Sequence, residues 1–279
     1  PSRIVIGTGS ERARKIMLDI YKPYQDQGFP IYLMSNVDAE LHKYAANSYL
    51  AAQISLTNNF ANLAKVAGGD WNRVKEGILA DTRIGKFVNS SPGFGGSCFE
   101  KDVEQLTHTF EQYDVDCTLL KEVLRQNKIQ KQLLAKRIKG KLGDLNGKTI
   151  AVWGLAFKAE TDDMRGAPSI PLIEGLIEAG AKIRAYDPVA VNESRKVFDN
   201  FEKKDSICYT EDKYSALEGS DALAIVTEWK EFVSADLTRV KQLLRQPIIF
   251  DGKDLFKSEE ILRYGFYYSS IGKPDIRSQ

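Results

Sequence analysis

The sequence predicts an α/β protein built in three parts. These are a partial amino-terminal α/β unit at residues 1–36, a central domain with a long dimerisation helix at 37–142, and a carboxy-terminal doubly wound, Rossmann-like parallel sheet at 143–279. Two observations predict this organisation. Residues 39–67 contain no Pro or Gly and carry apolar residues at helical spacing, whereas strand and helix patterns alternate after residue 147.

The amino-terminal unit is expected to form a strand at 3–7, a helix at 10–27 and a second strand at 31–34. Two strands are too few to cover the edges of a sheet. The sequence therefore predicts that further chain precedes residue 1 in the gene.

The central part is expected to be helical. Its longest helix, 39–67, ends at Gly68-Gly69, where two glycines stop the helical pattern. Shorter helices are predicted at 72–79 and 99–113, a Gly-, Ser- and Pro-rich loop at 89–97, and a further long helix at 119–139.

The carboxy-terminal part alternates apolar strands with helices over short turns. The strands are expected at 149–154, 182–186, 222–226, 248–250 and 266–271, and the helices at 169–179, 192–198 and 258–264. Such alternation is typical of parallel, doubly wound sheets.

Composition excludes several classes of function. The formal charge is +1 with acids and bases interspersed, so the chain offers no basic surface for nucleic acid or an anionic membrane. No apolar run approaches the ~20 residues that span a bilayer, and the first residues lack the pattern of a signal peptide. A cytoplasmic protein with neither a nucleic-acid nor a membrane partner is expected.

The few cysteines and histidines restrict the chemistry further. Three cysteines are too few and too scattered for a disulfide framework or a zinc cluster, and they fit a reducing compartment. Two histidines argue against a His-ligated metal and a Ser-His-Asp hydrolase. No metal is expected, and catalysis must use other groups.

The segment GFGGSCFEKD, residues 93–102, places three glycines before Cys98 at the expected start of a helix. Glycines allow close backbone approach to a ligand, and the free N–H groups of a first helical turn favour a thiolate or an oxyanion. Asp102 lies one turn further on, where a carboxylate could handle a water. Cys98 is thus a candidate nucleophile, and a buried structural cysteine is the alternative.

Lys43 and Asn47 are four residues apart on the long helix and therefore share a face. A cation beside an amide could stabilise a developing negative charge. The alternative is that Lys43 extends to solvent and Asn47 caps a neighbouring backbone.

The stretches ELHKYAANSYLAAQISLTNNFAN and GFGGSCFEKD resemble the central region of the UDP-glucose and GDP-mannose dehydrogenase family. PSRIVIG resembles the last part of that family's first domain, and GLAFKAETDDMR resembles its second nucleotide domain. The similarity follows the whole chain in order. Within the family, the motif GGSCF is found in enzymes that act on UDP-glucose. The motif GGSCL is found in those that act on GDP-mannose, and GGHC in those that act on N-acetylated UDP-hexoses. Phe99 therefore favours UDP-glucose as the substrate.

The resemblance implies oxidation of sugar C6 from alcohol to carboxylate with two molecules of NAD. It implies that Cys98 attacks the intermediate aldehyde to give a thiohemiacetal, which is oxidised to a thioester that water hydrolyses. Lys43 and Asn47 would then stabilise the negative oxygen, and Asp102 would handle the hydrolytic water.

The resemblance also implies binding residues. Arg83 would reach the sugar bound in the neighbouring subunit, and the alternative is that Arg83 is simply exposed to solvent. Lys253 stands where the family commonly has an arginine near the substrate. This difference puts the contact between residue 253 and the substrate in doubt. The implied substrate-binding residues are Phe87, Asn89, Ser90, Phe94, Gly95, Arg83, Phe157, Lys158 and Lys253, and the implied cofactor-binding residues are Ser97 and Arg165.

The G-x-G-x-x-G turn of a dinucleotide-binding site is missing. Gly7-Thr8-Gly9 follows the first strand, but Arg12 stands where the third glycine should be. The chain is therefore expected to be a truncated dehydrogenase that binds NAD poorly and is inactive alone. There are two rival hypotheses. One is a non-catalytic fragment that binds nucleotide sugar or dimerises, and the other is a sister dehydrogenase for GDP-mannose or UDP-N-acetylhexosamine.

A homodimer through helix 39–67 is expected, because this apolar helix needs cover on more than one side.

Overall fold

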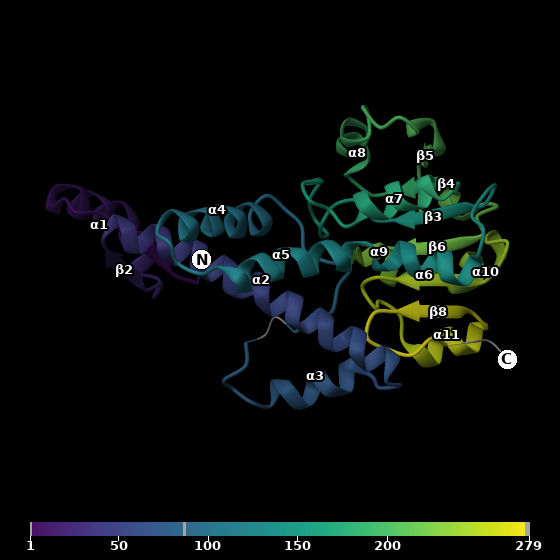
Figure 1. The fold of residues 1–279 in the computed structure, drawn as a ribbon, viewed down its shortest axis with the longest axis horizontal. Helices are drawn as coiled ribbons and strands as arrows, with labels where there is room; N and C mark the ends of the chain where they lie inside the picture. Colours follow the sequence, from purple (N-terminus) through teal and green to yellow (C-terminus); the bar gives the residue numbers. More distant parts are fainter. Residues whose placement is uncertain (1, 86–87, 277–279) are drawn as a thin grey trace.

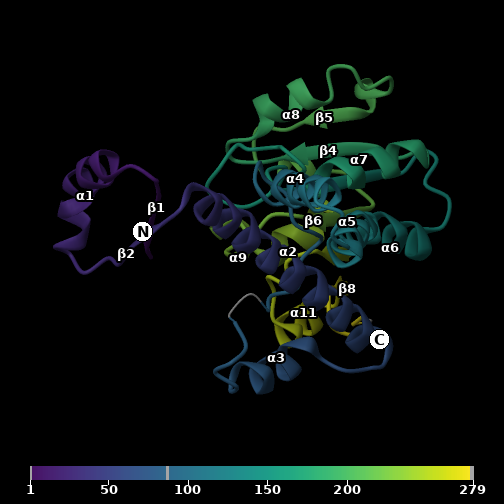
Figure 2. The ribbon, with the colours of Figure 1, turned by 60° about the vertical axis from the view of Figure 1, so that its left-hand side comes forward.

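The computed structural model describes residues 2–85 and 88–276. Figures 1 and 2 show a small amino-terminal unit at one end, the carboxy-terminal sheet at the other, and a long helix, α2 (Asn36–Val66), running between them.

In the amino-terminal unit, strands β1 (Ile4–Gly7) and β2 (Ile31–Met34) pair in parallel on either side of helix α1 (Glu11–Gln25) in the sequence. Ser10 caps α1, its Oγ accepting from the Ala13 N–H at 3.3 Å. No residue of α1 is buried. The strand, helix and strand predicted for this unit are confirmed.

Helix α2 begins at Asn36, three residues earlier than expected, because Ser35 supplies its N-cap. Helices α4 (Phe99–Gln112) and α5 (Thr118–Lys131) pack against α2, and α3 (Trp71–Leu79) lies beside its carboxy-terminal half. The buried side chains that join α2, α4 and α5 are Ala51, Phe94, Val103 and Val123.

The single helix expected at 119–139 is wrong, because the chain forms two helices, α5 and α6 (Leu133–Leu142). Gln132 separates them, and its N–H bonds to the Ile129 carbonyl, three residues back, at 3.2 Å. The two helices serve different cores. The end of α5 binds the central domain through Lys131, whereas Leu134 and Ile138 of α6 are buried in the core of the carboxy-terminal sheet.

The carboxy-terminal sheet has six parallel strands, which confirms the predicted doubly wound α/β fold. In spatial order they are β5 (Ile207–Tyr209), β4 (Lys182–Tyr186), β3 (Thr149–Trp153), β6 (Ala222–Ile225), β7 (Ile248–Asp251) and β8 (Tyr267–Ser270). The strand order reverses between β3 and β6. Ligands of such sheets bind outside the carboxyl ends of the strands at this point.

Helices cover both faces of this sheet, so its strands are apolar on both sides. Along β3, Ile150 and Val152 enter one core while Ala151 and Trp153 enter the other. Helices α6, α7 (Ser169–Glu178) and α8 (Val191–Val197) border the first core. Helices α9 (Lys230–Val233), α10 (Leu237–Leu243) and α11 (Ser258–Tyr264) border the second. Short 3-10 turns occur at Lys204–Ser206 and Ser215–Leu217.

Lys65, in the last turn of α2, forms hydrogen bonds with β8 and the segment that follows it. Lys65 donates to the Ser270 and Lys273 carbonyls at 3.2 and 2.9 Å and pairs with Asp275. Arg137 of α6 donates to the same Ser270 carbonyl at 2.9 Å. Burial lowers the pKa of Lys65 and lowers the pKa of Arg137 to about 10. These buried cations tie α2, α6 and β8 together.

None of the described helices is long and apolar enough to cross a membrane.

Candidate active site

Helices α2 and α4 bring three of the predicted catalytic residues together. Lys43 Nζ lies 3.1 and 3.0 Å from the two carboxylate oxygens of Asp102, and Asn47 Nδ2 lies 2.5 Å from Asp102 Oδ2. Asp102 is 4% exposed, whereas the Lys43 side chain is 61% exposed. The carboxylate thus fixes a cation and an amide at one place while the cation stays open to a ligand.

Asp102 also favours the charged form of Lys43. The hydrogen bond from Lys43 to Asp102, and then the nearby negative charges, raise the pKa of Lys43 more than burial lowers it. The amine is therefore an ammonium at neutral pH. It can donate hydrogen bonds and stabilise negative charge, but it cannot serve as a general base.

Cys98 is the N-cap residue of α4, and its side chain caps no backbone N–H. It is exposed, and its Sγ lies 3.5 Å from Ser97 Oγ. A cavity of about 580 Å³ is lined by Lys43, Gly96, Ser97, Cys98, Glu100, Lys101, Asp102, Glu104, Arg165 and Gly166. The thiol, the ammonium and the buried carboxylate thus open onto one space, together with both residues predicted to contact the cofactor.

The glycines before Cys98 pack directly on the carboxy-terminal domain. Gly96 N–H donates to the Arg165 carbonyl at 2.7 Å. A Cβ atom at Gly95 would come within 2.8 Å of the Gly166 carbonyl carbon and 3.0 Å of Phe157 Cβ, which a real side chain cannot do. The absence of side chains thus lets two domains meet beside the thiol.

A second cavity, of about 360 Å³, is lined by Gly93, Phe94 and Gly95 of the same loop. Six predicted substrate residues line it, namely Asn89, Phe94, Gly95, Phe157, Lys158 and Lys253. Ser90 lines a neighbouring cavity of about 520 Å³ to which Asn89 and Lys253 also contribute. Lys253 pairs with Glu228 at 2.7 Å, which holds its ammonium at the boundary between the two cavities.

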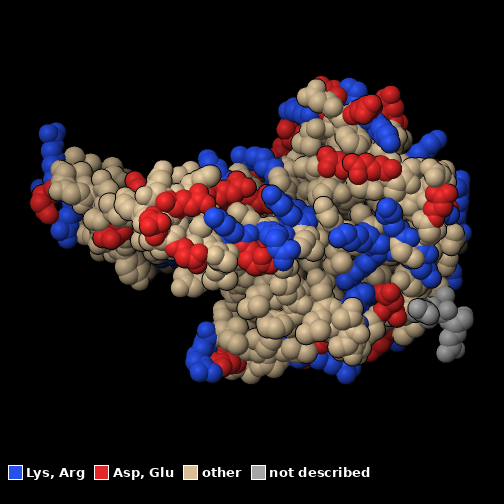
Figure 3. All heavy atoms as spheres, viewed as in Figure 1, with Lys and Arg blue, Asp and Glu red and all other residues tan. Residues whose placement is uncertain are grey.

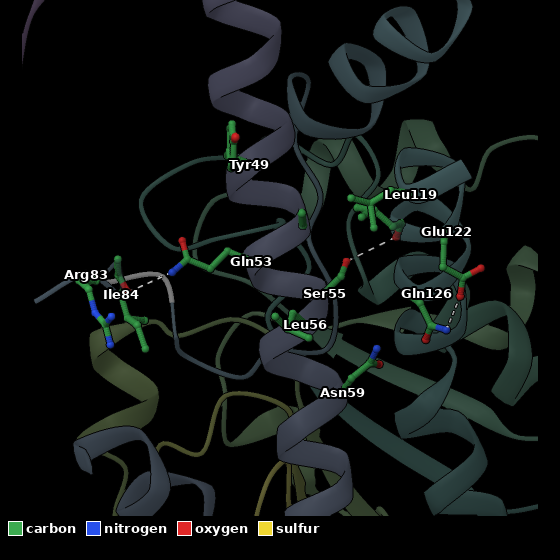
Figure 4. A pocket seen from close by; sticks show the side chains of 13 residues that line it. Tyr49, Gln53, Ser55, Leu56, Asn59, Arg83, Ile84, Leu119, Glu122 and Gln126 are labelled. Atoms are coloured by element: carbon green, nitrogen blue, oxygen red, sulfur yellow. Dashed lines mark hydrogen bonds between the residues drawn. The ribbon is translucent and has the colours of Figure 1, made fainter. Parts of the chain in front are cut away.

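The structure does not bring Arg83 to these cavities. Arg83 pairs with Asp81 at 2.6 Å, and this hydrogen bond raises the pKa of Arg83. It lines a separate pocket with residues of α2 and α5, and in Figure 4 it lies on the opposite side of α2 from Glu122 and Gln126. Arg165 is paired as well, with Asp163 at 2.8 Å. Phe87 lies outside the described residues.

Three residues that the sequence analysis did not single out hold the Cys98 loop. Asn127 and Lys131, one turn apart on α5, both donate to Glu100 Oε1, at 3.0 and 2.5 Å. The sequence contained a signal for this pair. Asn127 and Lys131 are an amide and a lysine four residues apart, and Lys43 and Asn47 have the same spacing on their helix. Among the described residues, no group of three or more His, Cys, Asp or Glu could hold a metal ion.

Comparison with known proteins gives one consistent result. Residues 37–129 match the central domain, and residues 151–258 the UDP-binding domain, of the UDP-glucose/GDP-mannose dehydrogenase family. The chain is 39% identical to a UDP-glucose 6-dehydrogenase of Rickettsia bellii and 38% identical to the UDP-glucose 6-dehydrogenase TuaD of Bacillus subtilis. The matches cover 98% and 99% of the chain but only 62% and 58% of those relatives, so the chain spans about three fifths of their length.

Solved structures agree with this assignment. A UDP-glucose dehydrogenase of Pyrobaculum islandicum superposes with a TM-score of 0.86 at 34% identity, over 98% of this chain and 59% of that one. A UDP-D-ManNAc dehydrogenase of Pyrococcus horikoshii gives 0.78 at 25% identity, over 98% of this chain and 60% of the other. The two domain matches, the curated relatives and the superposition together show that the chain belongs to the UDP-glucose/GDP-mannose dehydrogenase family.

Proposed function

We propose that this chain carries the catalytic and nucleotide-sugar sites of an NAD-dependent enzyme that oxidises C6 of UDP-glucose to the carboxylate of UDP-glucuronate. The observation that carries the proposal is that Cys98, Lys43 and Asp102 share one cavity. Gly95, in the loop before Cys98, lines a second cavity together with Phe157, Lys158 and other predicted substrate residues. The similarity to relatives named UDP-glucose 6-dehydrogenase supports the choice of sugar.

Cys98 acts at the aldehyde stage. Its thiolate adds to C6, the C–S bond forms, and the carbonyl oxygen becomes an oxyanion. Loss of a hydride from C6 leaves a thioester. Water then adds to C6, the C–S bond breaks, the thiolate leaves, and the carboxylate remains. Each oxidation removes two electrons from the same carbon, so the sugar loses four in all.

Lys43 and Asn47 stabilise the oxyanion, since both are donors fixed by the same buried carboxylate. Asp102 keeps them in place through both stages and accepts the proton of the hydrolytic water. An ammonium held by a carboxylate suits this role better than a neutral amine, because it meets the negative charge that develops on oxygen.

Two molecules of NAD, bound in succession, would each supply the acceptor for one hydride. Ser97 and Arg165, the two residues implied to contact NAD, both line the Cys98 cavity. The turn after β3 does not offer a second dinucleotide site. Asp187, in the region where such domains hold the ribose, is 2% exposed and accepts from the Leu155 N–H at 2.8 Å and the Trp229 indole at 3.1 Å.

Calorimetric titration of this chain tests the proposal. We expect UDP-glucose to bind the chain and its Cys98→Ala variant with affinities within about twofold, because the thiol acts only after the first oxidation. NAD should bind weakly or not at all. Competition with GDP-mannose and UDP-N-acetylhexosamines tests the choice of sugar. A folded chain that does not bind UDP-glucose, or that prefers a competitor, would contradict the substrate proposal.

We also propose a homodimer through α2. Apolar side chains at the spacing of successive helical turns are exposed along α2, including Leu56 at 55% and Leu63 at 61%. Figure 3 shows few charged side chains over the carboxy-terminal half of α2, whereas acidic and basic side chains gather nearer to α4 and α5. The pocket in Figure 4, lined by Tyr49, Leu56, Ile84 and Leu119 among others, extends this surface from α2 to Leu119 on one side and to Ile84 on the other. An apolar helix face of this length is typical of an interface between two copies.

Light scattering tests the dimer. We expect the parent chain at micromolar concentration to have twice the 31.3 kDa of one copy. Leu56→Glu should give monomers, because it places a charge in the centre of the surface. Val189→Glu is the matched control, since Val189 is similarly exposed, at 51%, but lies outside α2. A monomeric parent, or dissociation by both variants alike, would refute the proposal.

A further inference from the structure

The first turn of α4 presents a chemical difficulty to a reactive thiol. Cys98 stands at the N-cap, where backbone N–H groups favour a thiolate. The same turn carries two carboxylates, Glu100 and Asp102, which line the same cavity as the thiol. Negative charges that line the same cavity as a thiol oppose formation of its thiolate.

Each of the two carboxylates is paired with an ammonium from a different helix. Lys43 of α2 pairs with Asp102 at 3.0 Å, and Lys131 of α5 pairs with Glu100 at 2.5 Å. The first pair belongs to the proposed oxyanion site. The second pair has no assigned function, although Lys131 is only 8% exposed and its burial is costly unless the charge is matched.

Lys131 and its neighbour Asn127 also hold the loop that leads to Cys98. Asn127 is 2% exposed, accepts from the Phe94 N–H at 2.9 Å and donates to the Phe94 carbonyl at 3.0 Å. A Cβ atom at Gly93 would come within 2.7 Å of Lys131 Cγ. The loop before Cys98 and the turn after it are therefore attached to the same two side chains of α5.

We infer that Lys131, Asn127 and Glu100 are positioning residues for Cys98: they fix both sides of its turn to α5, and Lys131 cancels the carboxylate charge that would otherwise suppress the thiolate. The inference rests on the proposed function only for the role of Cys98 as nucleophile. With Glu100 and Asp102 each paired with a lysine, neither carboxylate charge is left uncompensated in the cavity that contains the thiol. The charged groups that face this cavity are Lys43 from α2, Glu100, Lys101, Asp102 and Glu104 from α4, and Arg165 from the segment before α7.

Alkylation of Cys98 by iodoacetamide tests the inference without NAD or sugar. A Cys208→Ser background isolates the reaction, because Cys208 is exposed and Cys117 is buried. We expect Lys131→Met to slow alkylation at pH 7 about fivefold and to move its pH profile upward, because the charge of Glu100 is then uncompensated. Glu100→Gln should act in the opposite direction, and the double variant should react within about twofold of the background protein.

Two further variants complete the test. Lys131→Arg should preserve the background rate, because it keeps the charge. Lys128→Met, an exposed lysine one helical turn before position 131, should change nothing. If Lys131→Met fails to fold, Glu100→Gln and the double variant still decide the question. Equal slowing by Lys131→Met and Glu100→Gln, or unchanged rates in both, would overturn the inference. The titration with UDP-glucose is independent of this result, so failure of the two proposals can be told apart.

Discussion

Replacing Cys98 with serine should reduce formation of UDP-glucuronate by at least about 10³-fold, measured in a form of the enzyme that contains these residues and binds NAD. A serine hydroxyl is a much weaker nucleophile than a thiolate at neutral pH, and Lys43, as an ammonium, cannot deprotonate it. The measurement is the rate of NADH formation together with quantification of the carboxylate product.

The matched control is Cys208→Ser, which removes an exposed thiol on β5, outside the residues that line the Cys98 cavity. This variant should keep the parent rate within about twofold. If Cys98→Ser retained more than about a tenth of the parent rate, covalent catalysis through this residue would be ruled out.

Lys43→Met should lower kcat about 10²- to 10³-fold with little change in KM for UDP-glucose. The ammonium lies where negative charge develops on the C6 oxygen, so its contribution appears in the transition state and not in the bound alcohol. Steady-state kinetics in the NAD-competent enzyme would separate the two parameters.

Lys136→Met is the control for Lys43→Met, because Lys136 is exposed on α6 and does not line the cavity. It should leave both constants unchanged. A rise in KM with an unchanged kcat in Lys43→Met would mean that the lysine holds the substrate and does not stabilise the oxyanion.

The sequence predicted the long elements because their periodicity is strong. Helix α2 and the central strands β3 and β6 follow from uninterrupted apolar patterns. It missed β5, α9 and α10, which are three, four and seven residues long, although Asp236 before α10 was a cap signal. The break at Gln132 depends on which core each half of the helix reaches, and periodicity cannot show this. The domain boundary expected near residue 142 stays a prediction. Helix α6, which lies before that residue, already packs on the carboxy-terminal sheet.

The site was predictable where spacing along one helix fixes a face. Lys43 and Asn47 do lie together, at Asp102. The positions of Asn127 and Lys131 depend on how α5 packs against a loop 33 residues earlier in the chain, as in the bond between Asn127 and Phe94. Arg83 was assigned by resemblance, and its role in a neighbouring subunit stays a prediction because one copy contains no such neighbour.

The hydrogen bonds that Lys65 forms with the segment at and after β8 have a consequence for biosynthesis. Its partners lie 204 to 210 residues further along the chain, so they are synthesised well after α2. Contacts of such sequence separation are slow to form and are unavailable until the later segment has been translated. The end of α2 therefore stays uncovered on the nascent chain until residues 269–275 have been made. A chain that stops before residue 269 would lack these partners and would leave this end of α2 exposed.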